Sequence, residues 1–207
     1  MYPKLQETIQ QLAVGTHTSE SRQDRLAPLI AYIQQKTNAR QTIVLHFICT
    51  HNSRRSHLAQ IWAQVAAAYH GISPVHCYSG GTETTALFPT VTTTLSDQGF
   101  EVFKIAEGHN PIYAIKYEDD APPIIGFSKK YDHAFNSSSG FAAVMTCSQA
   151  DGDCPFIAGA EQRISIPYKD PKESDGMPNE AKTYAERSLE IASDLFYAFA
   201  MIKKTII

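Results

Sequence analysis

The sequence carries little net charge and contains no long apolar run. Its 18 Lys and Arg residues nearly balance 21 Asp and Glu residues, which gives a formal net charge of −3. This mild acidity argues against a protein that binds nucleic acid or another polyanion. No apolar stretch approaches the length of a membrane span, and residues 1–10, MYPKLQETIQ, lack the apolar core of a signal peptide. We therefore expect a cytoplasmic protein with no membrane or nucleic-acid partner.

Cysteine is scarce as well, because the 207 residues include only four. In a cytosolic chain of this size, cysteines favour catalytic or redox work over structural disulfides. No Cys or His pair has the short spacing of a zinc site, so the sequence predicts no metal and no bound cofactor. Cys77 falls in the middle of a predicted strand and is expected to be a core thiol. The candidates for chemistry are the other three, Cys49, Cys147 and Cys154.

The first candidate lies where a predicted strand meets a predicted helix. Ile43–Ile48 is short, apolar and rich in branched residues, as in a buried strand, and Ser56–Tyr69 has apolar residues at helical spacing. A tight loop between a strand and a helix makes an anion cradle, because its amides point inward and the helix N-terminus adds about half a positive charge. The predicted oxyanion-binding residues are Thr50, His51, Asn52, Ser53, Arg54, Arg55 and Ser56.

Two side chains of this loop have complementary chemistry. Cys49 stands at the strand end, and Arg55 follows six positions later at the start of the helix. A thiolate among amide groups and beside a guanidinium is stabilised, so it should be nucleophilic at neutral pH. The planar fork of Arg55 suits the equatorial oxygens of a tetrahedral oxyanion. Ser56 is placed to donate a hydrogen bond to the thiolate.

Strands and helices alternate after this loop, which predicts an α/β fold with a parallel sheet and catalytic groups at the C-terminal ends of strands. Residues 1–40 predict two amphipathic helices separated by a break at Gly15–Ser19. A hairpin is predicted around residues 118–123. The remaining predicted strands are Val75–Ser79, Glu101–Ile105, Ile112–Tyr117, Ile124–Ser128, Phe141–Thr146 and Ile164–Ile166, and the remaining helices are Pro89–Gln98 and Asn179–Lys204.

Two further motifs follow in the C-terminal half. Residues 147–155, CSQADGDCP, place Cys147 at a strand end and Cys154 beyond a small, acidic, Gly-containing segment. Such a segment is typical of a mobile loop, and its two cysteines can form a disulfide if the loop bends. The alternative is two unrelated thiols, one in the core and one on the surface. In the second motif, Pro171 restricts Asp170 to an extended backbone and so fixes its direction.

Together these features resemble the low-molecular-weight protein tyrosine phosphatases and the thioredoxin-coupled arsenate reductases of the same superfamily. The resemblance rests on CTHNSRRS at 49–56, YSGGTE at 78–83 and the Asp170–Pro171 pair, and it covers roughly residues 42–100 and 141–204. It implies a three-layer α/β sandwich around a mainly parallel sheet of about four strands, within a catalytic domain of residues 41–207. Residues 1–40 are then an N-terminal helical extension, and an insertion lies near 105–135.

The resemblance also implies roles for individual residues. Asp170 would be the general acid facing Cys49, while Asn52 and Ser79 would hold the shape of the loop. The segment CSQADGDCPF is similar to the one that carries the second and third redox cysteines of the reductases, a pair that the phosphatases lack. The chain departs from the family at His51, where Gly is usual, and after Asp170–Pro171, where an aromatic pair of the tyrosine phosphatases is replaced by Lys-Glu.

Three functions follow as hypotheses. The first is reduction of arsenate to arsenite by a relay of Cys49, Cys147 and Cys154, with an external dithiol such as thioredoxin as reductant. The second is hydrolysis of phosphotyrosine or a small phosphate ester through a phosphocysteine on Cys49. The third is a redox-sensing or oxyanion-binding module without turnover. The sequence leaves the reductant and the oligomeric state undetermined, with a homodimer among the alternatives.

Overall fold

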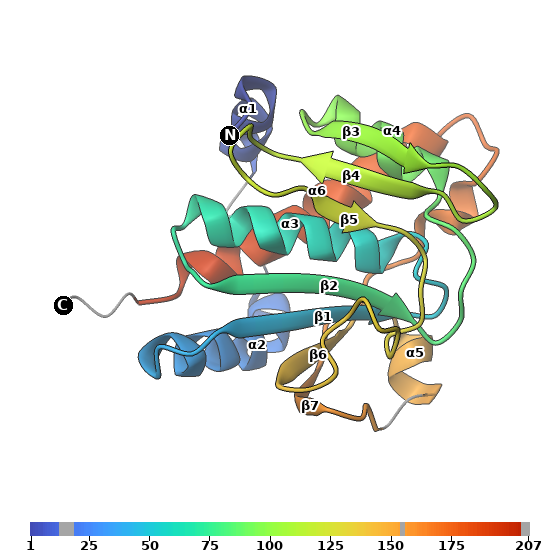
Figure 1. Cartoon of the computed structure of the whole chain (residues 1–207). Helices are drawn as coiled ribbons and strands as arrows, with labels where there is room; N and C mark the ends of the chain where they lie inside the picture. Colours follow the sequence, from blue (N-terminus) through green and yellow to red (C-terminus); the bar gives the residue numbers. More distant parts are fainter. Residues whose placement is uncertain (13–18, 154–155, 204–207) are drawn as a thin grey trace.

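The computed structural model describes residues 1–12, 19–153 and 156–203, which form a parallel sheet covered by helices and a smaller antiparallel sheet (Figure 1). The helices are α1 (Pro3–Gln11), α2 (Glu20–Asn38), α3 (Arg55–Tyr69), α4 (Pro89–Asp97), α5 (Ser148–Asp153), the short 3-10 helix η1 (Pro171–Ser174) and α6 (Glu180–Ala200). The strands are β1 (Ile43–Cys49), β2 (Val75–Gly81), β3 (Glu101–Ala106), β4 (Ile112–Lys116), β5 (Ile124–Gly126), β6 (Phe141–Met145) and β7 (Ala160–Ser165).

The central sheet has the strand order β2-β1-β6-β7, and its paired strands all run parallel. Since β1 is paired on both sides and buried on both faces, its sequence is a nearly continuous apolar run rather than an alternating one. The predicted α/β fold with a parallel sheet of about four strands is confirmed. The parallel order also brings the C-terminal ends of β1 and β6, and therefore Cys49 and the residues after Met145, to one edge of the sheet.

The two faces of this sheet are covered unequally. Ile43, Leu45 and Phe47 of β1 belong to the main core, which also contains the apolar sides of α2, α3 and α6. The opposite face, with Ile48 of β1, belongs to a smaller apolar cluster that includes Ala150 of α5. The expected three-layer arrangement therefore consists of one thick helical layer, the sheet, and a thinner layer formed by α5 and neighbouring loops.

The two predicted N-terminal helices are confirmed, and both pack against the rest of the chain. Helix α2 lies against α6 and β7, where Arg22 forms an ion pair with Asp194 at 2.6 Å. The chain before α1 is fixed by the Tyr2 amide, which donates to the Tyr117 carbonyl at 2.9 Å. Most of the predicted break between the helices, residues 13–18, lies outside the described residues.

The region near 105–135 contributes to a separate antiparallel sheet of order β3-β4-β5, seen at the top of Figure 1. Its predicted hairpin is confirmed, because β4 and β5 pair antiparallel across residues 117–123. After β5 the chain returns to the main sheet, where Lys130 bridges Gly81 at the end of β2. The segment after β5 therefore lies beside the predicted active-site loop.

The prediction of a mobile loop after Cys147 is wrong for residues 148–153, which form α5. The helix is started by Cys147 itself, whose sulfur accepts from the Ala150 amide at 3.3 Å and whose carbonyl accepts from the Asp151 amide at 3.1 Å. Cys154 and Pro155 lie outside the described residues.

At the C-terminus, α6 ends at Ala200, four residues before the predicted end at Lys204. Lys204 itself lies outside the described residues. Among the described helices, none combines the length and the apolar character required to cross a bilayer.

Candidate active site

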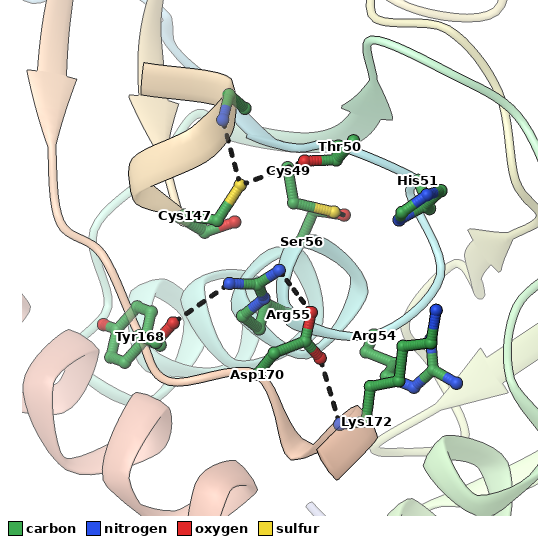
Figure 2. A network of polar contacts seen from close by, with 12 residues as sticks. Cys49, Thr50, His51, Arg54, Arg55, Ser56, Cys147, Tyr168, Asp170 and Lys172 are labelled. Atoms are coloured by element: carbon green, nitrogen blue, oxygen red, sulfur yellow. Dashed lines mark hydrogen bonds and ion pairs between the residues drawn. The ribbon is translucent and has the colours of Figure 1, made fainter. Parts of the chain in front are cut away.

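The predicted loop forms a tight cradle between β1 and α3 (Figure 2). Asn52 has a φ of 45°, a left-handed conformation that Asn tolerates better than most residues, and this position reverses the chain. Within the described hydrogen bonds of turns and loops, none of the amides of residues 50–54 donates to a backbone carbonyl. Those amides and the N-terminus of α3 therefore provide the donors of an anion site.

A chain of hydrogen bonds leads to the Cys49 sulfur. Cys49 is buried, and its Sγ lies 3.1 Å from Ser56 Oγ. Asn52 Nδ2 donates to the same Ser56 oxygen at 2.9 Å, which leaves the Ser56 hydroxyl hydrogen for the sulfur. Asn52 Oδ1 in turn accepts from the Lys129 amide at 2.9 Å. This arrangement gives the Cys49 sulfur a hydrogen-bond donor and fixes its direction.

Arg55 and Asp170 meet directly, although 115 positions separate them in the sequence. The Arg55 guanidinium donates through Nη2 to Asp170 Oδ2 at 2.5 Å and through Nη1 to the Tyr168 carbonyl at 3.1 Å (Figure 2). The other carboxylate oxygen of Asp170 accepts from the Lys172 amide at 3.1 Å, which holds the first turn of η1. The sequence-predicted nucleophile, arginine and acid therefore line one pocket, together with His51.

The contact between Arg55 and Asp170 narrows that pocket. The remaining cavity beside Cys49 is about 10 Å³, roughly the space of a single water. A tetrahedral oxyanion is larger, and on reaching Arg55 it would compete with the Asp170 carboxylate for the guanidinium. The carboxylate therefore already uses one of the two donors of the guanidinium fork.

Arg54, the neighbouring arginine of the loop, has a different set of partners. Its Nε donates to the Tyr184 hydroxyl and its Nη2 to Asp175, each at 2.5 Å, and the guanidinium lies 4.0 Å from the centroid of the Phe88 ring. The side chain therefore ties the loop to α6 and to the residue after η1. Its backbone amide belongs to the cradle, whereas its charge is already neutralised by Asp175.

His51 stands at the outer side of the loop. Its Nε2 is 3.5 Å from Glu83, and both side chains are more than one-third exposed. Its carbonyl accepts from the hydroxyls of Ser128, at 2.9 Å, and Thr85, at 3.3 Å. The His51 side chain is thus accommodated toward solvent, while its backbone anchors the loop.

Sequence reasoning missed the contribution of residues 128–131. Ser128 contacts the His51 carbonyl, the Lys129 amide holds Asn52, and the Lys129 carbonyl accepts from the Gly81 amide at 2.9 Å. Ser128 and Lys129 therefore support the outer wall of the cradle. No local sequence pattern in this segment predicts such a role, because each contact depends on the path that the chain takes after the antiparallel sheet.

Lys129 also brings a buried amine behind the loop. Its Nζ lies 3.5 Å from Ser79 Oγ and 4.5 Å from the centroid of the Phe127 ring, and burial lowers the pKa of Lys129 to about 7. Ser79, predicted to support the loop, contacts His57 Nδ1 at 3.2 Å. Burial, together with the Lys129 charge, holds the pKa of His57 well below its usual range and lowers that of His46 to about 3. Both histidines are therefore neutral at physiological pH.

Cys147 lies next to the beginning of the loop (Figure 2). Its Sγ is 3.5 Å from Thr50 Oγ1, it is 1% exposed, and it shares an apolar cluster with Cys49. In the described part of the chain, Cys49, Cys77 and Cys147 are free thiols. Two of the three predicted redox cysteines are therefore brought together, and the third, Cys154, lies outside the described residues.

The donor set of the pocket suits an anion rather than a cation. Loop amides, the helix N-terminus and the Arg55 guanidinium all present hydrogens or positive charge toward it. Among the described residues, no group of three His, Cys, Asp or Glu side chains is arranged to bind a metal ion.

Comparisons with known proteins identify the fold. No family model matches the chain, and neither does any curated protein. Among solved structures, the low-molecular-weight phosphotyrosine phosphatase VcLMWPTP-2 of Vibrio cholerae O395 is similar over 76% of this chain and 94% of its own, with 14% identity and a TM-score of 0.50. The chain has the low-molecular-weight protein tyrosine phosphatase fold.

Two further structures with this phosphatase fold are similar to the chain. A YwlE variant from Bacillus subtilis is 13% identical and covers 76% of this chain and 97% of its own, with a TM-score of 0.49. The YwlE arginine phosphatase from Geobacillus stearothermophilus is 14% identical and covers 76% and 91%, with a TM-score of 0.45. At such identities the likeness concerns the fold, and the choice between hydrolysis and reduction depends on the site itself.

We expect Arg55→Lys to lower kcat/KM for an oxyanion substrate by roughly 100- to 1,000-fold, the range for loss of one preorganised oxyanion donor. Lysine keeps the charge but loses the fork that contacts Asp170 and Tyr168 together. Steady-state kinetics and inhibition by sulfate measure the effect. Arg25→Lys, on the exposed side of α2, is the matched control and should behave as wild type. Wild-type kinetics for Arg55→Lys would contradict the proposed oxyanion site.

Proposed function

We propose that the protein is a cysteine-dependent phosphatase that hydrolyses phosphate monoesters. The observation that carries this proposal is the meeting of the Cys49 thiol, the Arg55 guanidinium and the Asp170 carboxylate at one small polar pocket. Each group has a separate task in phosphoryl transfer, and the three come from β1, the start of α3 and the residue before η1. The phosphatase fold of the structural neighbours supports the same conclusion.

The reaction needs two displacements at phosphorus. The Cys49 thiolate attacks the phosphorus atom held by the loop amides and Arg55, an S–P bond forms, and the P–O bond to the leaving group breaks. Asp170 gives its proton to the leaving oxygen. Water then attacks the phosphocysteine, its proton passes to Asp170, and the S–P bond breaks to release inorganic phosphate. Ser56 stabilises the Cys49 thiolate as it is regenerated.

Arsenate reduction is the second candidate, and the position of Cys147 favours it. A phosphatase has no task for a second buried thiol beside its nucleophile, whereas a relay requires one. In the relay, Cys49 displaces water from arsenate to form an S–As bond. The Cys147 thiolate then attacks the Cys49 sulfur, an S–S bond forms, and the electron pair of the S–As bond leaves with arsenite. Two thiols are oxidised and As(V) becomes As(III).

The relay would continue through Cys154 and an external reductant. Cys154 attacks the Cys147 sulfur, frees Cys49, and leaves a disulfide between residues 147 and 154 for a thioredoxin-like dithiol to reduce. Residues 148–153, between the two cysteines, form the short helix α5, so this helix would have to unfold for the step to occur. A cytoplasmic location, where such dithiols are maintained, is part of the same proposal.

Single Cys→Ser variants separate the two enzymes and the module without turnover. If the protein is a phosphatase, Cys147→Ser and Cys154→Ser should both hydrolyse p-nitrophenyl phosphate at close to the wild-type rate, because water resolves a phosphocysteine. Wild-type protein should also give a phosphorylated Cys49 by rapid-quench mass spectrometry.

The same variants give a different pattern if the protein is a reductase. Cys154→Ser should then release one arsenite per chain and stop as a disulfide between Cys49 and Cys147, and Cys147→Ser should fail even in that turnover. Disulfide mapping after one turnover with arsenate identifies the bond. Arsenite release with this pattern, without p-nitrophenyl phosphate hydrolysis, would overturn the phosphatase proposal. Absence of both activities would favour the binding module.

A further inference from the structure

The two arginines of the cradle are already paired with carboxylates. Arg55 lies 2.5 Å from Asp170, and Arg54 lies 2.5 Å from Asp175. The loop amides and the N-terminus of α3 remain as donors, but a helix N-terminus supplies only about half a positive charge. A phosphate monoester brings nearly two negative charges at neutral pH. Most of that charge therefore has no counter-charge at the loop itself.

Lys129 is a buried amine without such a partner. It is 0% exposed, and among the described residues no carboxylate forms an ion pair with it. The described contacts of its Nζ are with neutral groups: Ser79 Oγ at 3.5 Å, the Phe127 carbonyl at 3.3 Å, and the ring centroids of Phe127 and Phe135 at 4.5 and 5.4 Å. A buried charge is costly without a counter-charge. When protonated, this amine is therefore an uncompensated positive charge in the interior.

The Lys129 amine lies behind the cradle. The backbone amide of the same residue donates to Asn52 Oδ1 at 2.9 Å, so Lys129 also anchors the turn of the loop. Ser79, which the amine contacts, lies two residues before Gly81 on β2, and Gly81 is paired with Cys49 of β1. With about 3.3 Å per residue and about 4.8 Å between strands, the Cα atoms of Ser79 and Cys49 are roughly 8 Å apart.

The charge of Lys129 reaches the start of α3 as well. His57 is the third residue of that helix, and burial together with the Lys129 charge holds the pKa of His57 well below its usual range. Salt screens charges in the interior much less than charges at the surface. An anion bound between the loop and α3 should therefore attract the Lys129 ammonium without touching it.

We propose that the Lys129 ammonium is the buried counter-charge of a doubly charged oxyanion held in the cradle. The inference rests on the oxyanion site of the proposed function and adds a charge selectivity to it. Coulombic attraction scales with the product of the charges, so the amine favours dianions, such as phosphate monoesters, over singly charged phosphodiesters. Burial lowers the pKa of Lys129 to about 7, so part of the amine is neutral in the free protein. A bound dianion favours the charged form, and Nζ then takes up a proton from solvent.

Sulfate is the probe, because it stays a dianion throughout the neutral pH range. Cys49→Ser is the parent protein, because it removes a thiol that could titrate beside the anion. The other titratable or charged side chains near Lys129 or the cradle are His46, His51, Arg54, Arg55, His57, Cys77, Tyr78, His133 and Asp170. They are the same in the parent and in a Lys129 variant of it, so a difference between these two proteins reports on Lys129.

In the parent, sulfate binding at about pH 8 should be accompanied by uptake of a fraction of a proton. Calorimetry in buffers of different ionisation enthalpy measures this uptake. Lys129→Met keeps a similar length without the charge, and it should bind sulfate about tenfold more weakly than the parent at about pH 6. The difference should vanish at about pH 9, where the free amine is neutral. Lys130→Met removes the same charge from the exposed neighbour and should match the parent at both pH values.

An equal loss of sulfate affinity at both pH values would mean that Lys129 only shapes the loop, and it would overturn the counter-charge. Unchanged affinity in a Lys129→Met protein that is folded by circular dichroism, or sulfate binding to the parent without proton uptake, would overturn it as well. The uptake is measured with Lys129 in place, so it tests the inference even if Lys129→Met does not fold. If the parent binds no sulfate, the oxyanion site of the proposed function fails together with this inference, whereas the other outcomes leave that site standing.

Discussion

Cys49→Ser should lower turnover by about 10⁴-fold or more, with either a phosphate ester or arsenate as substrate, as expected for loss of a nucleophile. Ser56 lies 3.1 Å from the Cys49 sulfur, and the loop amides and Arg55 add positive potential, so the site is arranged to hold a thiolate. A serine hydroxyl is far harder to ionise than a thiol, and this environment does not compensate for that difference. The measurement is kcat for p-nitrophenyl phosphate and for arsenate with a dithiol reductant.

Binding of an anion provides the control for Cys49→Ser. Serine is close in size to cysteine, leaves the amides, Arg55 and Ser56 in place and removes a negative charge, so inorganic phosphate should bind the variant at least as tightly as wild type. Calorimetric titration with phosphate tests whether the cradle is intact. Residual turnover within tenfold of wild type, in a variant that binds phosphate normally, would exclude Cys49 as the nucleophile under both enzyme proposals.

Asp170→Asn should have two opposite effects. Turnover should fall by about 10²- to 10⁴-fold, because the amide cannot protonate the leaving oxygen. Affinity for inorganic phosphate should rise, because the charged carboxylate that now lies 2.5 Å from Arg55 no longer competes for the guanidinium. The asymmetry follows from the narrow pocket, in which Asp170 already accepts from the Arg55 fork. Kinetics with substrates of different leaving groups and inhibition by phosphate measure the two effects.

A nearby acidic residue supplies the matched control for Asp170. Glu173 is three positions later, its side chain is 69% exposed, and it pairs with Lys169 at 2.9 Å. Glu173→Gln removes one charge from the same segment without touching Arg55, so both turnover and phosphate inhibition should stay near wild type. Weaker phosphate inhibition in Asp170→Asn would contradict the competition. A uniform loss for good and poor leaving groups alike would contradict the role of general acid.

Several features of the site were determined by the sequence within short segments. Ile43–Ile48, the loop from Cys49 to Arg55 and the helix that begins there are contiguous, so branched apolar residues, loop polarity and helical spacing were sufficient to predict them. The left-handed position at Asn52 could also be anticipated, because Asn adopts that conformation more easily than most side chains. Even the parallel sheet followed from the alternation of strands and helices.

Tertiary structure alone decided which distant groups meet at that loop. The family resemblance placed Asp170 opposite Cys49, but its contact with Arg55 across 115 positions depends on the path of the chain after β7. The local sequence likewise did not predict the partners of Arg54, the support from Lys129 or the helix after Cys147. Local patterns encode the period and burial of one element. The packing of all elements decides which side chains form hydrogen bonds and ion pairs with one another, because buried charges and polar groups need partners at the places to which the fold brings them.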